Sequence, residues 1–326
     1  MGRQGMNGCV NESVHVHTHT CMWAPADERA RIMRPLVAKP VPSVWLVRSL
    51  IVVLPWVPPR LVLRLGEWVG WLLYKVLPWR LNVIRRNLLR AERFTPSSSL
   101  TCSVYRHFAK MLLLTLHLPE RIVTTATTSI PDNISLFRDD CHEGGVILCS
   151  CHHGAWELLP TALSPHIPAH ARKQGCVVYR PLHNTALDDL LRARRTAAAR
   201  MSMIPDRGSF GTLLEALRNG GLVGLLADQR PPSAHSNVPI TLFGVRCEMS
   251  PGLEALHRST GAPVWFATLM LAEASDAHFC LSLERLAGRN EGRVETLSQS
   301  YANAVTRTVS LAPSQYFWFH DRWKAR

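Results

Sequence analysis

The chain has 326 residues, of which 47% are hydrophobic, and its formal net charge is +13 at pH 7. This composition excludes a disordered or fibrous protein, and the chain is long enough for one large hydrophobic core. The excess of positive charge predicts an anionic partner, which would be nucleic acid, an acidic membrane surface or an acidic carrier protein.

Residues 1–40 differ from the rest of the chain and predict a disordered extension. The alternating stretch Val14–Thr20 holds three histidines and is followed by Cys21, a set that could bind a metal ion. We expect no metal site there. A start codon assigned too early, with Met33 as the true start, is the other interpretation.

Residues 41–120 predict a helical segment that is basic and anchors the protein to a membrane. Charged residues interrupt the apolar residues 44–78, so no run of 18 apolar residues exists. Five of the ten tryptophans lie within residues 45–79, which is typical of a membrane interface. A monotopic or re-entrant anchor is therefore expected, with a helical hairpin in the core of a soluble domain as the alternative. Three prolines would divide the segment into two short helices: Pro55, Pro58 and Pro59.

The next predicted helix, residues 79–90, has an apolar stripe of Leu81, Ile84 and Leu88, and Arg85 lies away from it. Five arginines and Glu92 give residues 80–93 a local charge of +4. An anionic lipid headgroup or an acidic carrier would fit this surface, and a solvated face is the alternative.

Residues 121–326 alternate between strand and helix patterns, which predicts βαβ units and an α/β fold. We expect a mainly parallel mixed sheet flanked by helices. The predicted strands are residues 146–150, 176–179, 201–204, 222–226, 237–243, 263–270 and 278–285. The predicted helices are residues 155–163, 185–198, 208–219, 251–259 and 296–310.

The stretch Cys149–Glu157 is the first candidate for chemistry, because it follows the apolar strand pattern at residues 145–148. His152 then lies at the carboxyl end of a strand, where ligands bind in open α/β sheets. Gly154 permits a turn that leaves His152 in the loop and Glu157 in the first helical turn. A carboxylate on one ring nitrogen would make the imidazole a general base. A structural role for both residues is the alternative.

Three further polar clusters follow predicted strands, and each could instead be a loop ion pair. Because carboxyl ends of parallel strands share one edge of the sheet, the clusters are expected to line one crevice with His152 and Glu157. Arginine suits two-point recognition of phosphate. The clusters are Tyr179–Asn184, Pro205–Arg207 and Ala227–Arg230.

Together these motifs resemble the late acyltransferases of lipid A biosynthesis, which add lauroyl or myristoyl chains to a lipopolysaccharide precursor. The resemblance covers residues 44–326 and rests on five motifs in the family's order. They are HHGAWE at 152–157 (the HX4E motif), YRP with Asn184 at 179–184, ADQ at 227–229, PITLFG at 239–244 and PSQYFWFHDRWK at 313–324.

The resemblance implies a glycerolipid-acyltransferase-like fold and an acyltransferase that needs no cofactor. The donor would be an acyl carrier protein thioester, or acyl-CoA, and the acceptor a lipid A precursor or related glycolipid. The reaction would take place among membrane lipids at the cytoplasmic face of the inner membrane. No nucleic-acid partner is implied.

The resemblance also assigns roles to residues. His152 would be the general base and Glu157 its partner. His153 and Ala155 stand where Phe and Asn are usual, and the spacing to Glu157 selects His152 over His153. The implied substrate-binding residues, with Arg180 as the expected phosphate contact, are Arg180, Asn184, Arg207, Asp228 and Gln229.

Four other interpretations compete. An acyltransferase of the same superfamily acting on a lysophospholipid or another glycolipid would share the motifs. A thiol hydrolase would use Cys151 or Cys149 as its nucleophile, although we expect both cysteines to be small hydrophobic residues that pack in the core. A zinc site would use both thiols together with His152 and His153. The nine cysteines are scattered, form no CxxC pair and follow no secretory signal, which favours reduced thiols in a cytoplasmic setting. A membrane-attached nucleic-acid binder is the non-enzymatic alternative, but no nucleic-acid module is visible.

Overall fold

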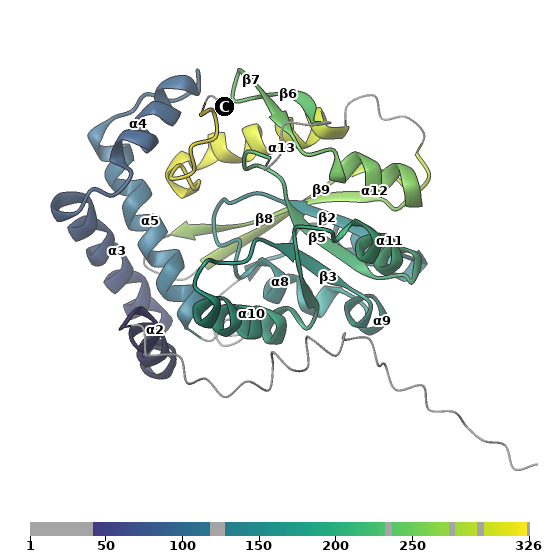
Figure 1. The fold of residues 1–326 in the computed structure, drawn as a ribbon, viewed down its shortest axis with the longest axis horizontal. Helices are drawn as coiled ribbons and strands as arrows, with labels where there is room; N and C mark the ends of the chain where they lie inside the picture. The colour runs from purple at the N-terminus through teal and green to yellow at the C-terminus, as the bar shows by residue number, and fades with distance from the viewer. Residues whose placement is uncertain (1–41, 118–127, 232–236, 274–277, 292–296, 325–326) are drawn as a thin grey trace, which may run out of the picture. The chain divides into compact units, whose positions relative to one another are not determined.

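The strand and helix alternation after residue 121 folds into a seven-stranded sheet in the computed structural model (Figure 1). The structure describes residues 42–117, 128–231, 237–273, 278–291 and 297–324. Residues Pro42–Arg326 form one compact unit. The predicted extension, with its histidines and Met33, lies outside the described residues.

The sheet has the strand order β1-β9-β8-β2-β5-β3-β4. All neighbouring strands run parallel except β8 and β9, which confirms a mainly parallel mixed sheet. The strands are β1 (Thr128–Ser129), β2 (Val146–Ser150), β3 (Cys176–Tyr179), β4 (Ser202–Pro205), β5 (Leu222–Leu226), β8 (Val264–Glu273) and β9 (His278–Ala287).

The strand predicted at residues 237–243 forms β6 (Val238–Leu242), but it does not join the large sheet. It pairs with β7 (Val245–Met249) in a separate antiparallel hairpin. β7 was not among the predicted strands, although Val245–Met249 alternates apolar and charged residues as a half-buried strand does. The hairpin packs against a helix near the carboxyl terminus, α13 (Leu297–Leu311).

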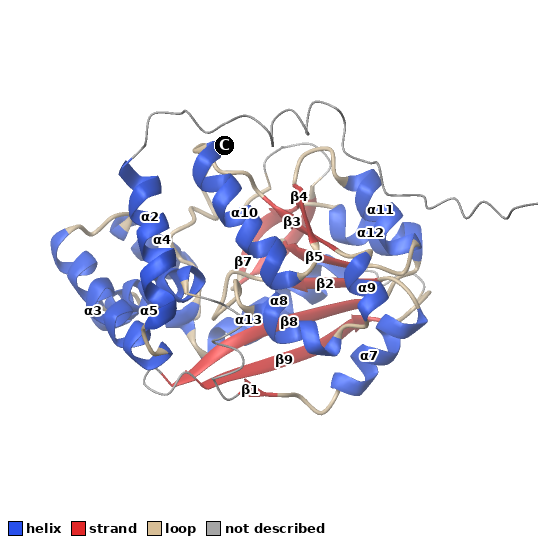
Figure 2. Ribbon diagram, turned by 90° about the horizontal axis from the view of Figure 1, so that it is seen from below, coloured by secondary structure: helices blue, strands red, loops and turns tan. Residues whose placement is uncertain are grey.

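Helices cover both faces of the sheet, as expected for buried parallel strands (Figures 1 and 2). Successive side chains of β2 alternate between two apolar clusters, with Val146 and Leu148 in one and Ile147 and Cys149 in the other. The first face is covered by α7 (Ile134–Glu143), α8 (Leu159–Leu163), α9 (Ala169–Lys173) and α10 (Thr185–Ala199). The second is covered by α11 (Phe210–Arg218), α12 (Gly252–Thr260) and α13.

Among the described residues, four α-helices precede the sheet and pack at one side of it (Figure 1, purple to blue). The prolines divide the first apolar stretch as predicted, because a short 3-10 turn separates the first two helices. On the third helix Ile84 and Leu88 are buried and Arg85 is exposed, as predicted. These helices are α2 (Pro42–Val53), α3 (Pro59–Val76), α4 (Leu81–Arg90) and α5 (Ser98–Leu116).

Two glycines let α3 approach α5 closely. A Cβ on Gly66 would lie 2.6 Å from the Lys110 Cα, and one on Gly70 would lie 2.4 Å from the Arg106 Cα. Both distances are shorter than side chains tolerate, so these helices need glycine at the crossing. Because α5 also contacts a 3-10 turn near the carboxyl terminus, η3 (Pro313–Gln315), the helical segment is continuous with the packing of the α/β part.

Many apolar side chains of α2 and α3 are exposed, together with the charged residues Arg48, Arg60, Arg64 and Lys75. Within the described residues, no helix combines the length and apolar character needed to cross a bilayer. Membrane association of this segment therefore stays a prediction. The exposed side chains include Trp45, Leu46, Trp56, Leu61, Leu65, Trp68, Leu72 and Val76.

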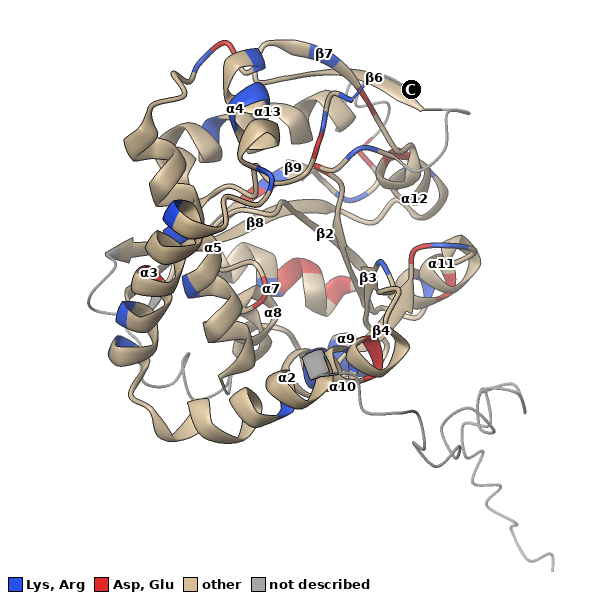
Figure 3. Ribbon diagram, turned by 60° about the vertical axis from the view of Figure 1, so that its left-hand side comes forward, with Lys and Arg blue, Asp and Glu red and all other residues tan. Residues whose placement is uncertain are grey.

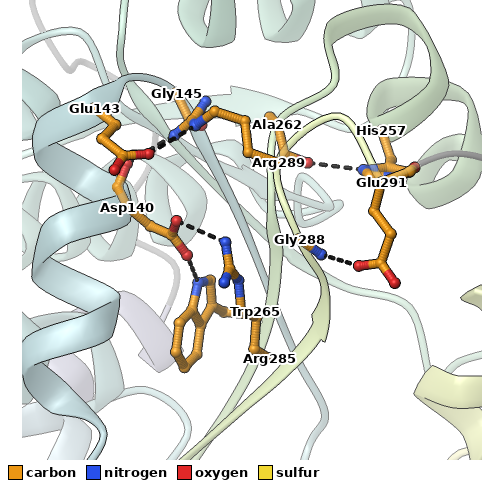
Figure 4. A network of polar contacts seen from close by, with 10 residues as sticks. All are labelled: Asp140, Glu143, Gly145, His257, Ala262, Trp265, Arg285, Gly288, Arg289 and Glu291. Atoms are coloured by element: carbon orange, nitrogen blue, oxygen red, sulfur yellow. Dashed lines mark hydrogen bonds and ion pairs between the residues drawn. The ribbon is translucent and has the colours of Figure 1, made fainter.

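A polar network fixes the amino end of β2 (Figure 4). Asp140 on α7 is buried and accepts hydrogen bonds from Trp265 Nε1 at 2.7 Å and from Arg285 Nη2 at 2.9 Å. Arg289 donates to the Asp140 carbonyl and forms an ion pair with Glu143. The network ties α7 to β8 and β9, so it holds the end of β2 that is opposite to His152.

Candidate functional site

The parallel register of β2 and β5 brings His152 and Asp228 together. Ser150 pairs with Leu226 at the carboxyl ends of these neighbouring strands. His152 and Asp228 each lie two residues beyond this pair, so they leave the sheet side by side. The His152 Nδ1 lies 2.8 Å from Asp228 Oδ1, and the His152 backbone N–H donates to Asp228 Oδ2 at 3.1 Å.

The surroundings of Asp228 keep this carboxylate charged. Burial alone would raise its pKa, but the electrostatic interaction with His152 and hydrogen bonds from His152 and the Tyr316 hydroxyl outweigh burial and hold the pKa below its ordinary value. A charged carboxylate accepts hydrogen bonds only, so Nδ1 of His152 carries a proton and donates it to Asp228. The other ring nitrogen, Nε2, is then the acceptor, and Gln229 Nε2 donates to it at 3.3 Å. The pair therefore presents a basic nitrogen beside Gln229.

Hydrogen bonds to the backbone on both sides of His153 hold the loop that carries His152. The Phe317 N–H donates to the His152 carbonyl, and His107 Nε2 lies 3.1 Å from the Gly154 carbonyl. Gly154 has φ +63°, and a Cβ there would lie 2.3 Å from the Leu269 carbonyl oxygen. The predicted turn at Gly154 is therefore confirmed, and glycine is required for both backbone conformation and space.

His153 faces away from solvent and has a structural environment. It is 0% exposed, and its Nε2 lies 3.0 Å from the Ala312 carbonyl oxygen. Burial lowers the pKa of His153 to about 4 and that of His107 to about 3, so both rings are neutral near pH 7. His152 keeps 23% of its side chain exposed. Of the two adjacent histidines, only His152 is available to a substrate.

The expected contact between Glu157 and His152 is wrong. Glu157 accepts two hydrogen bonds from Arg195, one from Nε at 2.9 Å and one from Nη2 at 2.6 Å. Among the described residues, no hydrogen bond or ion pair joins Glu157 to His152. The predicted helix start at residue 155 is also wrong, because α8 begins at Leu159. The Ala155 N–H donates to the Leu269 carbonyl, so the chain stays irregular and Glu157 points to α10 instead.

The same register rule pairs Arg180 with Asp206. Tyr179 and Pro205 are partners at the ends of β3 and β4, and the next residue of each strand forms an ion pair, with Arg180 Nε 2.9 Å from Asp206 Oδ2. More than half of the Arg180 side chain, 54%, stays exposed. The sequence left open whether this cluster forms a loop ion pair or lines the crevice. The ion pair is present, and it uses only the Nε of the Arg180 guanidinium.

A cavity of about 660 Å³ opens beside these groups, within the range of about 300–1,000 Å³ usual for small-molecule sites. Its polar part is lined by His152, Glu157, Arg180, Arg195, Asp206, Gln229 and Arg230. Its apolar part lies between β3, β4 and β5 and the helices α11 and α12. There it is lined by Val177, Val178, Met203, Phe210, Leu213, Leu225, Leu226, Leu253 and Leu256.

The cavity gathers most, but not all, of the predicted site residues. Asp228 lies behind His152, only 1% of its side chain exposed. Asn184 instead caps α10, since its side chain accepts a hydrogen bond from the Leu187 N–H. Arg207 is exposed and is not among the residues that line the cavity. The predicted crevice is therefore lined by His152, Glu157, Arg180 and Gln229, without Asp228, Asn184 and Arg207.

Two residues of the site were missed as functional candidates. Arg195 lies within a helix rich in alanine and arginine, where no spacing marks it as different from Arg192 or Arg194. Tyr316 lies in the carboxyl-terminal motif, but the sequence gives no sign that its hydroxyl reaches Asp228. Both contacts join segments far apart in the chain, which periodicity does not report.

The thiols near the site are not accessible. Cys149 and Cys151 are both 0% exposed, and burial raises the pKa of each well above its ordinary value. The Cys149 thiol donates to the Trp265 carbonyl oxygen. Thiolates are the nucleophilic form, so this environment opposes a thiol hydrolase. The part of the chain that the structure describes holds no group of three or more His, Cys, Asp or Glu side chains arranged for a metal ion.

An imidazole bonded to a buried carboxylate thus lies at the mouth of a largely apolar cavity. No curated protein matches the chain. Residues 34–325 match the family described as bacterial lipid A biosynthesis acyltransferase, so the chain belongs to that family and is an acyltransferase.

Proposed function

We propose that this acyltransferase moves a fatty acyl chain from an acyl carrier protein thioester to a hydroxyl group of a lipid A precursor. Acyl-CoA is the alternative donor. The observation that supports the proposal is the orientation of the His152 ring. Its Nδ1 is hydrogen-bonded to buried Asp228, while its Nε2 is an acceptor at the cavity. An imidazole in this state accepts a proton from a hydroxyl group.

In the proposed reaction His152 Nε2 takes the proton of the acceptor hydroxyl as its oxygen attacks the thioester carbon. The new carbon–oxygen bond forms a tetrahedral oxyanion, and its collapse breaks the carbon–sulfur bond. The thiolate leaves and takes the proton from His152. Asp228 stabilises the imidazolium that exists between these two steps, which is the role of the buried carboxylate in a catalytic triad.

The apolar part of the cavity supports an acyl substrate. Leucine, valine and methionine side chains from three strands and two helices surround it, so a hydrocarbon chain would leave water on binding. The polar groups gather at the end that contains His152. In the proposed complex, the chain therefore lies between α11 and α12 with its thioester at the imidazole.

Two arginines support binding of the polar parts of the substrates. Arg180 keeps Nη1 and Nη2 free of hydrogen bonds to other described residues, since Asp206 takes Nε. It is the proposed phosphate contact of the acceptor. Glu157 holds Arg195 by two bonds at the cavity wall, so we assign Glu157 a positioning role through Arg195.

The proposed location is the cytoplasmic face of the inner membrane. The exposed tryptophans and leucines of α2 and α3 support it, because indole rings beside apolar side chains favour the membrane interface. In this proposal the two helices lie in the interface. A lipid acceptor would then reach the cavity without leaving the bilayer surface.

Mass spectrometry of lipid products tests the proposal. The purified protein is incubated with acyl carrier protein or coenzyme A thioesters, and with a lipid A precursor or a lysophospholipid. We expect one added acyl chain on the lipid A precursor, and none with the His152→Ala variant. Acylation of the lysophospholipid alone would show that the acceptor is a lysophospholipid and not a lipid A precursor. Free fatty acid as the sole product would indicate a hydrolase and contradict the proposal.

A further inference from the structure

A second cavity, here called the basic groove, lies next to the site. It has a volume of about 650 Å³ and is formed by the end of α4, the strand β7 and the last described residues of the chain. Figure 3 shows Lys and Arg positions on α4 and β7 in this part of the molecule. The groove is lined by Arg90, Glu92, Arg230, Val245, Arg246, Cys247, Glu248, Arg322, Trp323 and Lys324.

The groove carries an excess of positive charge. Five cations and two carboxylates line it, which gives a net charge of +3. Three of its arginines donate hydrogen bonds to backbone carbonyl oxygens and have no ion-pair partner among the described residues, so their charges are not neutralised. Those bonds run from Arg90 to Trp323, from Arg230 to Lys324 and from Arg322 to Glu248.

Arg322 is the strongest sign that the groove suits an anion. It is only 5% exposed, its Nη2 donates to the Glu248 carbonyl, and its buried Nε has no hydrogen-bond partner. A buried guanidinium without a counter-ion has a high free energy, and an anion in the groove would lower it. Planar guanidinium groups match the oxygens of a phosphate.

Arg230 connects the groove to the candidate active site. It lines both cavities and follows Gln229, whose amide bonds His152. Its position is fixed, because its backbone N–H donates to His320 Nε2 at 3.1 Å and its Nη1 to the Lys324 carbonyl at 3.0 Å. A molecule with its reacting group at His152 can therefore extend past Arg230 into the groove.

We propose that the basic groove is an anion subsite that holds a phosphate group of a substrate while the substrate's reacting part lies at His152. This inference rests on the proposed function. The phosphate would belong either to the acceptor's sugar headgroup or to the phosphodiester in the thiol arm of the donor. Arg180, at the other side of the cavity, would contact a different group.

Steady-state kinetics of Arg246→Gln and Lys324→Gln test the subsite. Both residues are exposed, so the variants keep the fold, and each loses one positive charge. Arg218→Gln is the matched control, because Arg218 is exposed and lines neither cavity. Each groove variant should raise KM for one substrate roughly 10-fold or more, with little change in kcat. The control should match the parent.

Substrates without phosphate identify the source. If the acceptor supplies the group, the KM effect disappears with a dephosphorylated acceptor. If the donor supplies it, the effect disappears with an acyl pantetheine thioester that lacks the phosphodiester. Unchanged KM for both substrates in an active enzyme, or an equal change in Arg218→Gln, would overturn the subsite and leave the proposed function intact.

A binding measurement separates this result from failure of the function. If the parent protein transfers no acyl group, inorganic phosphate is titrated into the parent, Arg246→Gln and Arg218→Gln by calorimetry. Weaker binding to Arg246→Gln alone would support the anion subsite without the proposed reaction. Equal binding or no binding in all three proteins would overturn it.

Discussion

His152 has two ring nitrogens in different surroundings, and this difference determines which of them can act on a substrate. Nδ1 is occupied by a buried carboxylate, and Nε2 accepts only a 3.3 Å hydrogen bond from Gln229. An incoming hydroxyl can displace that amide. The partner that fixes the imidazole is Asp228, which the sequence analysis assigned to substrate binding, and not Glu157.

The reassignment of Glu157 predicts how two variants combine. If Glu157 acts by positioning Arg195, then Glu157→Gln and Arg195→Ala each lower acyl transfer, and the double variant is little worse than the more impaired single variant. Measured rate constants for the four proteins form the cycle. If the rate in the double variant fell by the product of the two single-variant factors, the two residues would act separately.

The buried histidines predict a pH dependence of stability. An unfolded histidine has a pKa near 6.5, whereas burial lowers the pKa of His107 to about 3 and of His153 to about 4. Between these values the unfolded chain binds more protons, so the free energy of unfolding falls as the pH falls from about 6.5 toward 4.

His153→Phe tests this interpretation and should stay active. Without the His153 imidazole, the free energy of unfolding should change less steeply with pH. Near pH 5 the slope should be smaller by about 1.4 kcal/mol per pH unit. Denaturant unfolding at several pH values measures the slope. An unchanged slope would mean that His153 titrates alike in both states.

At the scale of elements, strand register explains why so much of the site was predictable. The polar residues directly after β2, β5, β3 and β4 lie at one edge because these strands are parallel, and short apolar runs marked each strand in the sequence. The side-chain partners were not predictable. Glu157 follows a loop whose path is set by the Leu269 carbonyl, more than a hundred residues away in the chain.

The network at the amino end of β2 predicts a structural role for Asp140. Asp140→Asn removes the charge opposite Arg285 and one acceptor, which should lower the free energy of unfolding by about 1–3 kcal/mol. Glu143→Gln is the matched control from the same helix. Its side chain is 62% exposed, so its ion pair should contribute at most about 1 kcal/mol.

Urea unfolding of the parent and both variants provides the measurement. The rate of acyl transfer per folded molecule should be the same in all three, because the network and His152 lie at opposite ends of β2. Equal stability of Asp140→Asn and Glu143→Gln would show that the network is not important for the fold.

For the molecule as a whole, the exposed apolar side chains of α2 and α3 predict membrane binding. Trp68→Glu places a charge where 58% of an indole is now exposed, so the fold should remain intact. Its affinity for anionic lipid vesicles should fall about 10-fold, since one apolar side chain contributes roughly 1.5–3 kcal/mol. Leu311→Glu, on α13, is the control.

Vesicle sedimentation measures that affinity. Equal binding of Trp68→Glu and the parent would contradict an interfacial position of α3. Composition and the proline positions predicted two helices rich in the tryptophan and apolar residues typical of a membrane interface. They did not predict which side of each helix is buried. The close approach of α3 to α5 at Gly66 and Gly70 is a tertiary contact, and it selects the side that stays exposed.

His152, supported by Asp228, is the proposed general base of acyl transfer. The most direct test is the rate constant for acyl transfer in His152→Ala, compared with the parent on the same donor and acceptor. General-base catalysis contributes about 100- to 10,000-fold, so the rate should fall by at least 100-fold while folding and vesicle binding stay unchanged. A folded His152→Ala protein that transfers acyl chains at the parental rate would show that His152 is not the general base.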